Sequence, residues 1–550
     1  MLRFGTAGLR GPLREGPDGM NVTTVSRATA GLGDWLRGRC LGGGTVVVGR
    51  DARHGSAEFA TATAEILAAQ GFSVVLLPDP VPTPVVAFAV RALRAVAGVQ
   101  ITASHNPPAD NGYKVYLDGG SQLIAPADTE IERRIEAVTE PIDRVPVEPS
   151  GADLVQRYLA RIAELPTPAP SAGPVAAEAD PPAPGPGASP GPAGAGERES
   201  PEAARAPADR AEGPGGRLGR RRAPLRIALT PLHGVGGALA VEALRVAGFE
   251  DVHVVAEQFA PDPDFPTVAF PNPEEPGATD LLLALAERVD ADLAIALDPD
   301  ADRCALAVPT PDGWRQLRGD ETGVLLADYV LAGRPADPLV ATTLVSSRLL
   351  SKLAPARGAR YAETLTGFKW LARAGEGLVY AYEEAIGHCV DPSAVRDKDG
   401  ISAAVAAADL TARLKADGRT LIGELDVYAV EFGLHSGDQV SLRLPDQAAA
   451  AALTAALRAA PSGEIAGTPV KFTDQLQVRG RLRTDALILD ADDFRIVVRP
   501  SGTEPKLKCY LEVFTPVDGP AALPRARADA AARLAVLAAW CHDLADRGPR

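Results

Sequence analysis

The chain has 550 residues, which is too long for a single hydrophobic core and predicts about three to four domains. Hydrophobic residues make up 46% and charged residues 23%, as in globular proteins, and no apolar run approaches the roughly 20 residues that a membrane helix requires. The net charge of −15 argues against a general nucleic-acid binder, whose backbone contacts need a broad basic surface. A phosphorylated small molecule is compatible with this charge, because it needs only a local cluster of Arg and Lys.

The N-terminal sequence lacks the apolar segment of a signal peptide, so we expect a cytoplasmic protein with no membrane or nucleic-acid partner. No oligomeric state is indicated by the sequence. The cysteines are odd in number and lack a CxxC spacing, which favours reduced thiols over a disulfide framework or a zinc site. These are the five cysteines: Cys40, Cys304, Cys389, Cys509 and Cys541.

Residues 1–150 alternate between strand and helix patterns, which predicts a βαβ sheet. Arg10 ends a glycine-rich turn, and Arg53, after a predicted strand, is interpreted as a solvated turn residue. In chain order we predict a helix near 23–39, a strand within 45–53, a helix at 60–72, a strand from 73 and a buried strand within 95–103.

Ser104 follows the last of these strands and precedes a run of turn formers. It is therefore expected on a loop at the carboxyl end of a strand, where open α/β sheets bind ligands. A hydroxyl next to the imidazole of His105 suits nucleophilic or phosphoryl-carrier chemistry. The alternative is an ordinary turn serine.

A segment at about 166–223 consists of Pro, Gly, Ala and charged residues without aromatics. Such a composition cannot bury enough surface to offset chain entropy, so we predict a disordered insertion. Its basic end, Arg217 to Arg222, could contact an acidic partner, although solvated coil is the favoured interpretation.

Three alternating aspartates, Asp298, Asp300 and Asp302, lie between two apolar strand patterns. Carboxylates at this spacing repel one another unless a cation lies between them. Hard oxygen ligands at this density favour Mg²⁺, which often bridges to a phosphate. An acidic surface turn is the alternative.

A third unit, 313–424, contains Glu383, Glu384 and His388, which are expected on a loop after the strand ending at 382. The two carboxylates could accept hydrogen bonds from sugar hydroxyls, and the imidazole could donate to a phosphate or hydroxyl. The alternative is an exposed turn. The following sequence DKDG is predicted to cap a helix.

The last unit, from 425, contains two strand patterns that flank the sequence RPSGTEPK. Glycine lets successive backbone N–H groups converge on an anion, and the cations and hydroxyls supply further donors. A phosphate-binding loop is predicted, with a hairpin turn as the alternative. Its residues are Arg499, Ser501, Gly502, Thr503 and Lys506.

The four motifs TASHNP, DPDADR, YEEAIGH and RPSGTEPK resemble, in order and spacing, those of the α-D-phosphohexomutase superfamily, the phosphoglucomutases and phosphomannomutases. The resemblance covers the whole chain apart from the insertion. It implies three similar mixed-sheet α/β domains and a C-terminal α+β domain around a central cleft. The corresponding expected boundaries are 1–150, 151–312 with the insertion, 313–424 and 425–550.

The resemblance also implies a function, the interconversion of hexose 1-phosphate and hexose 6-phosphate, with glucose or mannose as the sugar. The expected route uses a phosphoserine, Mg²⁺ and a hexose 1,6-bisphosphate that serves as intermediate and activator. The implied catalytic residues are Ser104, His105, Arg10 and Lys114, and the implied metal ligands are Ser104, Asp298, Asp300 and Asp302. The implied substrate-binding residues are Arg303, Glu383, Glu384, His388, Arg499, Ser501, Gly502, Thr503 and Lys506.

The chain departs from the family pattern at Ile386, where dual-specificity phosphomannomutases often have Ser, and in this it is more similar to phosphopentomutase-like members. Pro299 and Ala301 stand where many members have glycine, but the aspartates and Arg303 are intact. Two alternatives therefore stay open: a mutase for pentose 1-phosphates or amino sugars, and a non-catalytic sugar-phosphate-binding protein.

Overall fold

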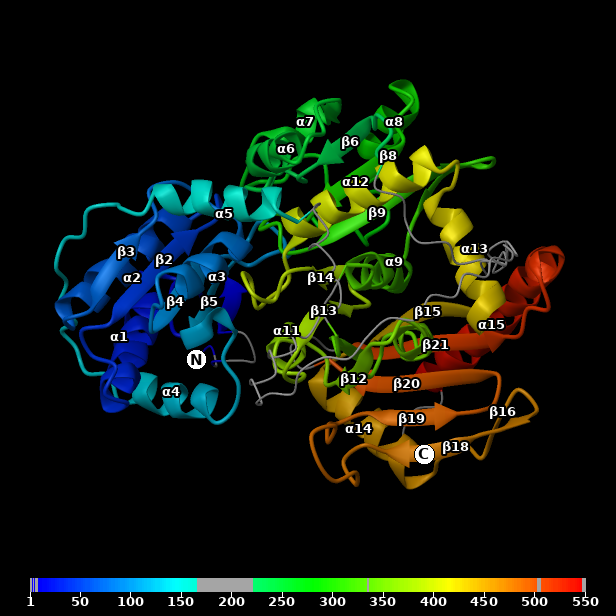
Figure 1. The fold of residues 1–550 in the computed structure, drawn as a ribbon. Coiled ribbons are helices and arrows are strands. Elements are labelled where there is room, and N and C mark those ends of the chain that lie inside the picture. Colours follow the sequence, from blue (N-terminus) through cyan, green and yellow to red (C-terminus); the bar gives the residue numbers. More distant parts are fainter. Residues whose placement is uncertain are drawn as a thin grey trace, which may run out of the picture.

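The computed structural model describes residues 8–165, 221–333, 336–501 and 506–546, together with Leu2 and Phe4. The predicted disordered insertion lies outside the described residues except for 221–223, and so do Gly502 and Thr503 of the predicted phosphate-binding loop. Within the described chain, four main sheets and a two-stranded ribbon follow one another along the sequence, as the colours of Figure 1 show.

The first sheet has the strand order β1-β5-β4-β2-β3. Strands β2, β3 and β4 are parallel, β5 is antiparallel to β4, and β1 is antiparallel to β5. Val46, Val47 and Val48 of β2 and all five residues of β4 are buried, as expected for strands covered on both faces. The elements of this unit are β1 (Leu9–Pro12), α1 (Val22–Gly38), β2 (Thr45–Arg50), α2 (Ser56–Ala69), β3 (Ser73–Leu76), α3 (Thr83–Ala92), β4 (Ala97–Ile101), β5 (Asp110–Leu117), the 3-10 turn η1 (Asp118–Gly120), α4 (Ala127–Glu136) and α5 (Asp153–Ala163).

The second sheet repeats this plan with the order β10-β9-β8-β6-β7. Strands β6, β7 and β8 are parallel, β9 is antiparallel to β8, and β10 is antiparallel to β9. Its strand β8 is an uninterrupted buried apolar run. The elements are β6 (Ile227–Thr230), α6 (Gly237–Val246), β7 (Val252–Val254), α7 (Ala256–Phe259), α8 (Asp280–Arg288), β8 (Leu293–Leu297), β9 (Cys304–Thr310) and β10 (Gly313–Gln316).

The third sheet, β12-β11-β13-β14, has the same three parallel strands and one antiparallel strand without the outer fifth. Helix α12 is buried along nearly its whole length and begins at an Asp399 N-cap. The elements are α9 (Gly319–Leu331), β11 (Leu339–Thr343), α10 (Leu349–Ala356), β12 (Arg360–Thr364), α11 (Phe368–Leu371), β13 (Leu378–Glu383), β14 (Gly387–Cys389), α12 (Gly400–Ala416) and α13 (Leu421–Phe432).

The fourth sheet, β15-β21-β20-β19-β18, is antiparallel throughout. Its elements are β15 (Leu434–Arg443), α14 (Gln447–Ala459), β16 (Glu464–Ile465), β17 (Thr468–Pro469), β18 (Lys471–Asp474), β19 (Leu487–Asp490), β20 (Phe494–Pro500), β21 (Lys506–Thr515), the 3-10 turn η2 (Pro520–Ala522) and α15 (Leu523–Asp546). The predicted fold class, three mixed-sheet α/β domains and a C-terminal α+β domain, is confirmed.

The first three units share one apolar core. A single cluster of buried side chains includes Phe88 of α3, Tyr158 of α5, Leu244 of α6 and Ile401 of α12. Most of the apolar side chains of the fourth unit form a separate cluster between its sheet and α15. No helix in the described ranges combines the length and the apolar character that crossing a membrane requires.

Glu512 of β21 ties the fourth unit to the third. Its carboxylate accepts hydrogen bonds from the Ser347 hydroxyl at 2.7 Å and from the Arg348 backbone N–H and Nε at 2.8 Å each. His435 Nδ1 of β15 lies 2.9 Å from the same carboxylate. Burial alone raises the pKa of Glu512, but His435, Arg348 and Ser347 outweigh burial and lower it to about 2.

We predict that Glu512→Gln destabilises the protein by about 3 kcal/mol, because the amide leaves the Arg348 charge without its buried partner. A thermal unfolding experiment at pH 7 is expected to give a lower midpoint than wild type. Since the folded pKa lies below the unfolded one, the wild-type advantage is present above about pH 4.5 and fades toward pH 2. Glu242→Gln removes an exposed ion pair with Arg245 and is the control, for which no change is expected. Equal midpoints for Glu512→Gln and wild type contradict this role.

Candidate active site

Ser104 lies in the loop between β4 and β5, where the sequence predicts it. It has a left-handed backbone (φ 54°) and is 2% exposed. Its Oγ donates to Asp298 Oδ2 at 2.8 Å and lies 3.2 Å from Nδ1 of His105. A hydroxyl of the first unit is thus held against a carboxylate of the second. The same loop leads directly into β5. This strand was not predicted from the sequence, because turn-forming residues precede it.

Arg53 holds the Ser104 loop in shape. Its guanidinium donates to the carbonyl oxygens of Ser104 and Asn106 at 2.6 Å each and to that of Pro107 at 2.8 Å. The residue is only 4% exposed and pairs with Asp51 at 3.4 Å. The interpretation of Arg53 as a solvated turn residue is wrong, because the carbonyl groups of this tight loop have no strand or helix to satisfy them and require a buried donor.

Arg10 and His105 lie beside the serine. Arg10 of β1 donates from Nη1 to Asn106 Oδ1 at 2.9 Å. Burial lowers the pKa of His105 well below its usual value, and the charges of Arg303 and Arg10 lower it further. Burial and these charges therefore favour the neutral form of the imidazole next to Ser104.

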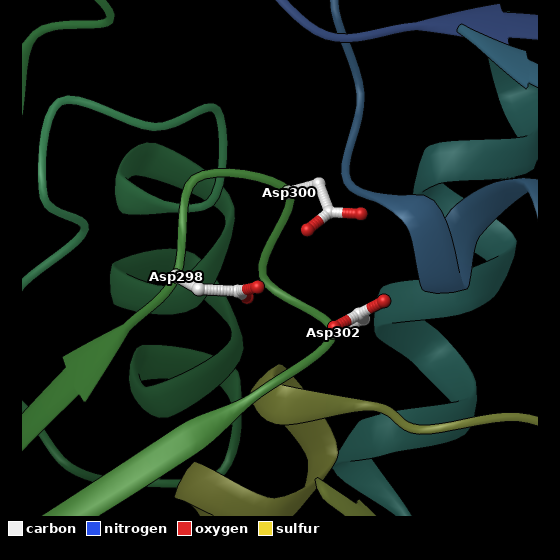
Figure 2. Close-up of side chains that lie close together, drawn as sticks. All are labelled: Asp298, Asp300 and Asp302. Carbon is white, nitrogen blue, oxygen red and sulfur yellow. The ribbon is translucent and has the colours of Figure 1, made fainter. Parts of the chain in front are cut away.

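The three predicted aspartates come together in the loop between β8 and β9. Figure 2 shows Asp298, Asp300 and Asp302 projecting from this one loop. One carboxylate oxygen from each lies within 4.8 Å of the other two, and all three residues are fully buried. The interpretation of this cluster as an acidic surface turn is wrong, because the loop is enclosed by segments of the first and third units.

Cations from two other units surround these aspartates. Lys114 Nζ of β5 lies 2.6 Å from Asp300 Oδ2 and 2.7 Å from Asp302 Oδ2. Lys398 Nζ, from the segment before α12, lies 3.1 Å from Asp302 Oδ2. Lys398 was not predicted from the sequence, because DKDG was interpreted only as a helix cap. Asp399 does cap α12, and the preceding Lys398 contacts the aspartate cluster.

A divalent cation fits the three aspartates. Within the described chain, Oδ1 of Asp300 and Oδ1 of Asp302 are buried without a hydrogen-bond partner. Burial, followed by the charges of Asp300 and Asp302, raises the pKa of Asp298 well above its usual value. Buried carboxylate oxygens that lack donors and repel one another are the ligand set that a hard cation requires.

Two glycines allow the aspartate loop to pack tightly. A Cβ on Gly234, after β6, would lie 2.3 Å from the Pro299 Cα, and one on Gly400, at the start of α12, would lie 2.5 Å from the Arg303 carbonyl oxygen. The glycine turn after β6 therefore packs directly against the aspartate loop, at a distance that leaves no room for a side chain.

Glu383 is the last residue of β13 rather than a loop residue, because it pairs with Gly387 of β14, and Glu384 follows in the turn between the two strands. Glu384 Oε2 accepts from the hydroxyls of Thr343 at 3.1 Å and Ser346 at 3.2 Å, both at the end of β11. Burial raises the pKa of Glu383 to about 7, although Lys398 and Arg303 act in the opposite direction. Two acids of the third unit thus lie close to cations of the aspartate cluster.

Arg303 joins the aspartate loop to this acid pair. Its backbone N–H donates to Asp298 Oδ1 at 3.0 Å, and an isolated β-bridge pairs it with Gly387. Its guanidinium lies 3.8 Å from Glu274 Oε2, in the proline-rich loop before α8. Glu274 was not identified from the sequence, because proline-rich loops carry no periodic signal.

His388 differs from the prediction. It lies in strand β14 rather than on a loop, is fully buried, and its Nδ1 is 3.1 Å from the Tyr380 hydroxyl. Burial lowers its pKa to about 3. Its neighbours are core tyrosines, since the Tyr382 ring also lies 6.4 Å away, and this environment fits packing better than substrate contact. The short turn after Glu384 returns the chain to the sheet sooner than the sequence suggested.

The ends of the predicted phosphate-binding loop lie on adjacent strands. Arg499 is in β20 and Lys506 begins β21, and the Ser501 backbone N–H donates to the Lys506 carbonyl at 2.8 Å. Gly502 and Thr503 lie outside the described residues. Lys369 of α11 is a further buried cation: burial lowers its pKa, and the charge of Arg499 lowers it further. No sequence pattern had marked Lys369.

Comparison with known proteins identifies the family. Models of the phosphoglucomutase/phosphomannomutase domains match along the chain: alpha/beta/alpha domain I at residues 1–141, domain II at 219–313, domain III at 318–428 and the C-terminal domain at 440–519. The chain belongs to the phosphoglucomutase/phosphomannomutase family. The resemblance in the four motifs is thereby confirmed.

Relatives in this family carry several substrate names. The chain is 38% identical to a protein named probable phosphomannomutase from Haemophilus influenzae, covering 90% of this chain and 93% of that one. It is 32% identical to the human phosphopentomutase (94% and 85% covered) and 30% identical to a Staphylococcus aureus phosphoglucomutase (94% and 90% covered). All three names denote mutases, so this family member is an enzyme, an isomerase that transfers a phosphoryl group within its substrate.

Solved structures have the same fold. The parafusin phosphoglucomutase of Paramecium superimposes with a TM-score of 0.68 at 18% identity, covering 100% of this chain and 96% of that one. A phosphoglucomutase/phosphomannomutase family protein of Burkholderia thailandensis gives 0.64 at 21% identity, with 96% of each chain covered. At these identities the comparison supports the four-unit fold alone.

We predict that Asp300→Asn weakens Mg²⁺ binding at least about tenfold, because it removes one of three charged oxygen ligands. Isothermal titration calorimetry of the purified protein with MgCl₂ measures this without any need for turnover. Asp312→Asn, in the exposed turn between β9 and β10, changes the net charge equally and is expected to bind like wild type. An unchanged Mg²⁺ affinity in Asp300→Asn, with an unchanged unfolding midpoint, contradicts a metal site at this cluster.

Proposed function

We propose that this enzyme interconverts hexose 1-phosphates and hexose 6-phosphates, with glucose or mannose as the sugar, through a phosphate carried on Ser104. The observation that supports this most directly is the 2.8 Å contact between Ser104 Oγ and Asp298, next to the buried aspartates. A binding protein has no need of a hydroxyl at this junction, whereas a phosphoryl carrier requires one beside a cation site.

In the first step the phosphorylated Ser104 donates to the free hydroxyl of the bound sugar phosphate. The bond between Ser104 Oγ and phosphorus breaks, and a bond forms between phosphorus and the sugar oxygen. The hydroxyl proton leaves to a protein base, and Ser104 Oγ regains a proton. The product is a hexose 1,6-bisphosphate, which turns over and returns its other phosphoryl group to Ser104 by the reverse exchange.

Asp298, Asp300 and Asp302, with an oxygen on Ser104, are the residues that would hold Mg²⁺. When bound there, the cation supplies positive charge to the phosphoryl oxygens, which spread negative charge in the transition state. Arg10 and His105 lie beside Ser104 and orient its phosphoryl group. Lys114 of β5 is assigned to proton transfer at the reacting hydroxyl.

The remaining loops bind the rest of the substrate. Glu383 and Glu384 are proposed to accept hydrogen bonds from sugar hydroxyls, and Arg303 is proposed to contact the substrate beside them. Arg499, Ser501, Gly502, Thr503 and Lys506 are proposed to hold the phosphate that does not react, and Lys369 adds a cation near Arg499. His388 is left out of this set because of its place in the core.

A second candidate function is a phosphopentomutase. It is favoured by the relatives named phosphopentomutase and phosphoribomutase, which match 93% or 94% of this chain, and by Ile386 in the sugar loop. The hexose assignment is supported by the 38% identity to the relative named probable phosphomannomutase. The interpretation as a non-catalytic protein has no support from the relatives, which are named as enzymes.

We predict that Ser104→Ala abolishes turnover, with a loss of at least about a thousandfold in kcat, because no other group carries the phosphate. A coupled assay with a hexose 1,6-bisphosphate primer present measures it. The control Ser150→Ala, at an exposed site between α4 and α5, is expected to retain wild-type activity.

Intact-mass measurement and peptide mapping of active wild-type protein are expected to place one phosphate on Ser104. The protein as translated is then inactive until that residue is phosphorylated. Wild-type turnover by Ser104→Ala, or a catalytic phosphate that maps to another residue, contradicts the scheme.

We predict the highest kcat/KM with glucose or mannose 1-phosphate in a panel that also contains ribose 1-phosphate and glucosamine 1-phosphate. Ser104→Ala protein assayed in parallel gives the background for each sugar. A higher kcat/KM with ribose 1-phosphate overturns the hexose assignment in favour of the phosphopentomutase.

A further inference from the structure

A second cationic pocket lies apart from the candidate active site. It is a cavity of about 690 Å³ between the end of α3, the turn η1, helix α5 and the segment after β14. Three arginines line it: Arg91, Arg94 and Arg161. Of the described residues that line the cavity, none is acidic. None belongs to the loops that carry Ser104, the three aspartates, Glu384 or the RPSGTEPK sequence.

Two of the arginines are fixed in the wall. Arg91 Nε donates to the Ser393 carbonyl at 2.9 Å and Nη1 to the Gly119 carbonyl at 2.8 Å. Arg161 Nε pairs with Asp391 at 2.7 Å, and its Nη2 donates to the Ser393 hydroxyl at 3.2 Å. These contacts hold both guanidinium groups in place before any ligand arrives, which lowers the entropic cost of binding.

The other arginines are not neutralised. Arg94, which has a left-handed backbone (φ 51°), and Arg396 are exposed, and neither side chain makes a hydrogen bond or ion pair to any described residue. Arg396 follows two residues after Ala394, which lines the cavity. Burial lowers the pKa of Arg91 and the charge of Arg396 lowers it further, although Asp391 acts in the opposite direction. Of the described residues, Asp391 and Glu164 form ion pairs with an arginine that lines the cavity, and both are paired with Arg161.

Three guanidinium groups line the cavity, a fourth belongs to Arg396 in the adjoining segment, and the two carboxylates in contact with them both pair with Arg161. The site is therefore positive on a protein whose net charge is −15. Unpaired like charges held close together repel one another, and an anion with two or more charges relieves that repulsion. Guanidinium groups match the planar arrangement of phosphate and carboxylate oxygens. The volume admits a compact molecule and is well below that of a folded partner domain.

We propose that this pocket binds a small polyanion, a phosphate ester or diphosphate, at a site separate from the active site. The pocket lies at the opposite end of α3 from Thr83, whose hydroxyl donates to Asp300 at 2.5 Å; ten helical residues span about 15 Å. The segment that carries Ser393 also carries Lys398, the partner of Asp302. The site therefore adjoins two elements that reach the aspartate cluster, but its residues are not part of that cluster.

The test uses inorganic pyrophosphate as the probe and full-length protein without added metal. Isothermal titration calorimetry of wild type is expected to show pyrophosphate binding that Arg94→Glu/Arg396→Glu weakens at least about tenfold or removes. These two side chains support no described contact, so the variant is expected to fold and to keep wild-type mutase activity. Pyrophosphate is also expected to raise the unfolding midpoint of wild type more than that of the variant.

The double variant Arg134→Glu/Arg288→Glu carries the same charge change on the surface of α4 and α8 and is the matched control, expected to bind like wild type. Arg499→Ala tests whether pyrophosphate binds at the active site instead. If Arg499→Ala still binds pyrophosphate, and adding Arg94→Glu/Arg396→Glu removes that binding, the result supports the pocket. Equal pyrophosphate binding by Arg94→Glu/Arg396→Glu and wild type overturns the proposal, and so does an equal loss in the matched control. Neither outcome depends on which sugar the enzyme uses.

Discussion

The assembly of this protein depends on neutralising three buried aspartates. Asp298, Asp300 and Asp302 belong to one short loop of the second unit, and that loop supplies only Arg303 as a cation. Charges buried without partners cost several kcal/mol each. The missing positive charge comes from Lys114 of the first unit and Lys398 of the third, so the aspartate loop is stable only when the three units are packed together. The apolar cluster that spans the three units supplies that packing, and the ion pairs of Lys114 and Lys398 fix how the units are aligned.

The three α/β units present their functional residues from equivalent positions. In each sheet the third parallel strand runs into a loop that returns as an antiparallel strand: β4 to β5, β8 to β9, and β13 to β14. Each loop contains a non-glycine residue with left-handed backbone, Ser104 (φ 54°), Ala301 (φ 51°) and Ile386 (φ 53°). Such backbone is unfavourable for these residue types and persists where surrounding contacts impose it. One supersecondary plan thus provides a hydroxyl, a set of carboxylates and an acid pair.

The sequence was sufficient to predict the buried parallel strands that lead into the site, and the polar residues that follow them. Apolar runs such as those of β4 and β8 mark buried parallel strands, and the polar residues that follow must lie at the carboxyl edge of the sheet. What it could not supply are contacts between residues far apart in the chain. Arg53 satisfies carbonyl groups some fifty residues later, and Lys398 pairs with an aspartate almost a hundred residues earlier. Local patterns assign such residues to ordinary turns and caps, and only the folded chain gives their partners. The predicted loop position of His388 was wrong for a local reason, because a strand of three residues leaves no periodic signal.

Charge balance links the metal and the phosphate of the proposed mechanism. Without either, the aspartate cluster has three carboxylates and three cations in ionic contact with them, Lys114, Lys398 and Arg303, so its formal charge is already balanced. A divalent cation alone would add two positive charges to a buried site, and a phosphate on Ser104 alone would add nearly two negative ones. Either addition by itself carries the desolvation cost of an unpaired buried charge, whereas the two together restore the balance. If Ser104 carries the phosphate as proposed, these residues would hold the cation and the phosphoserine best when both are present.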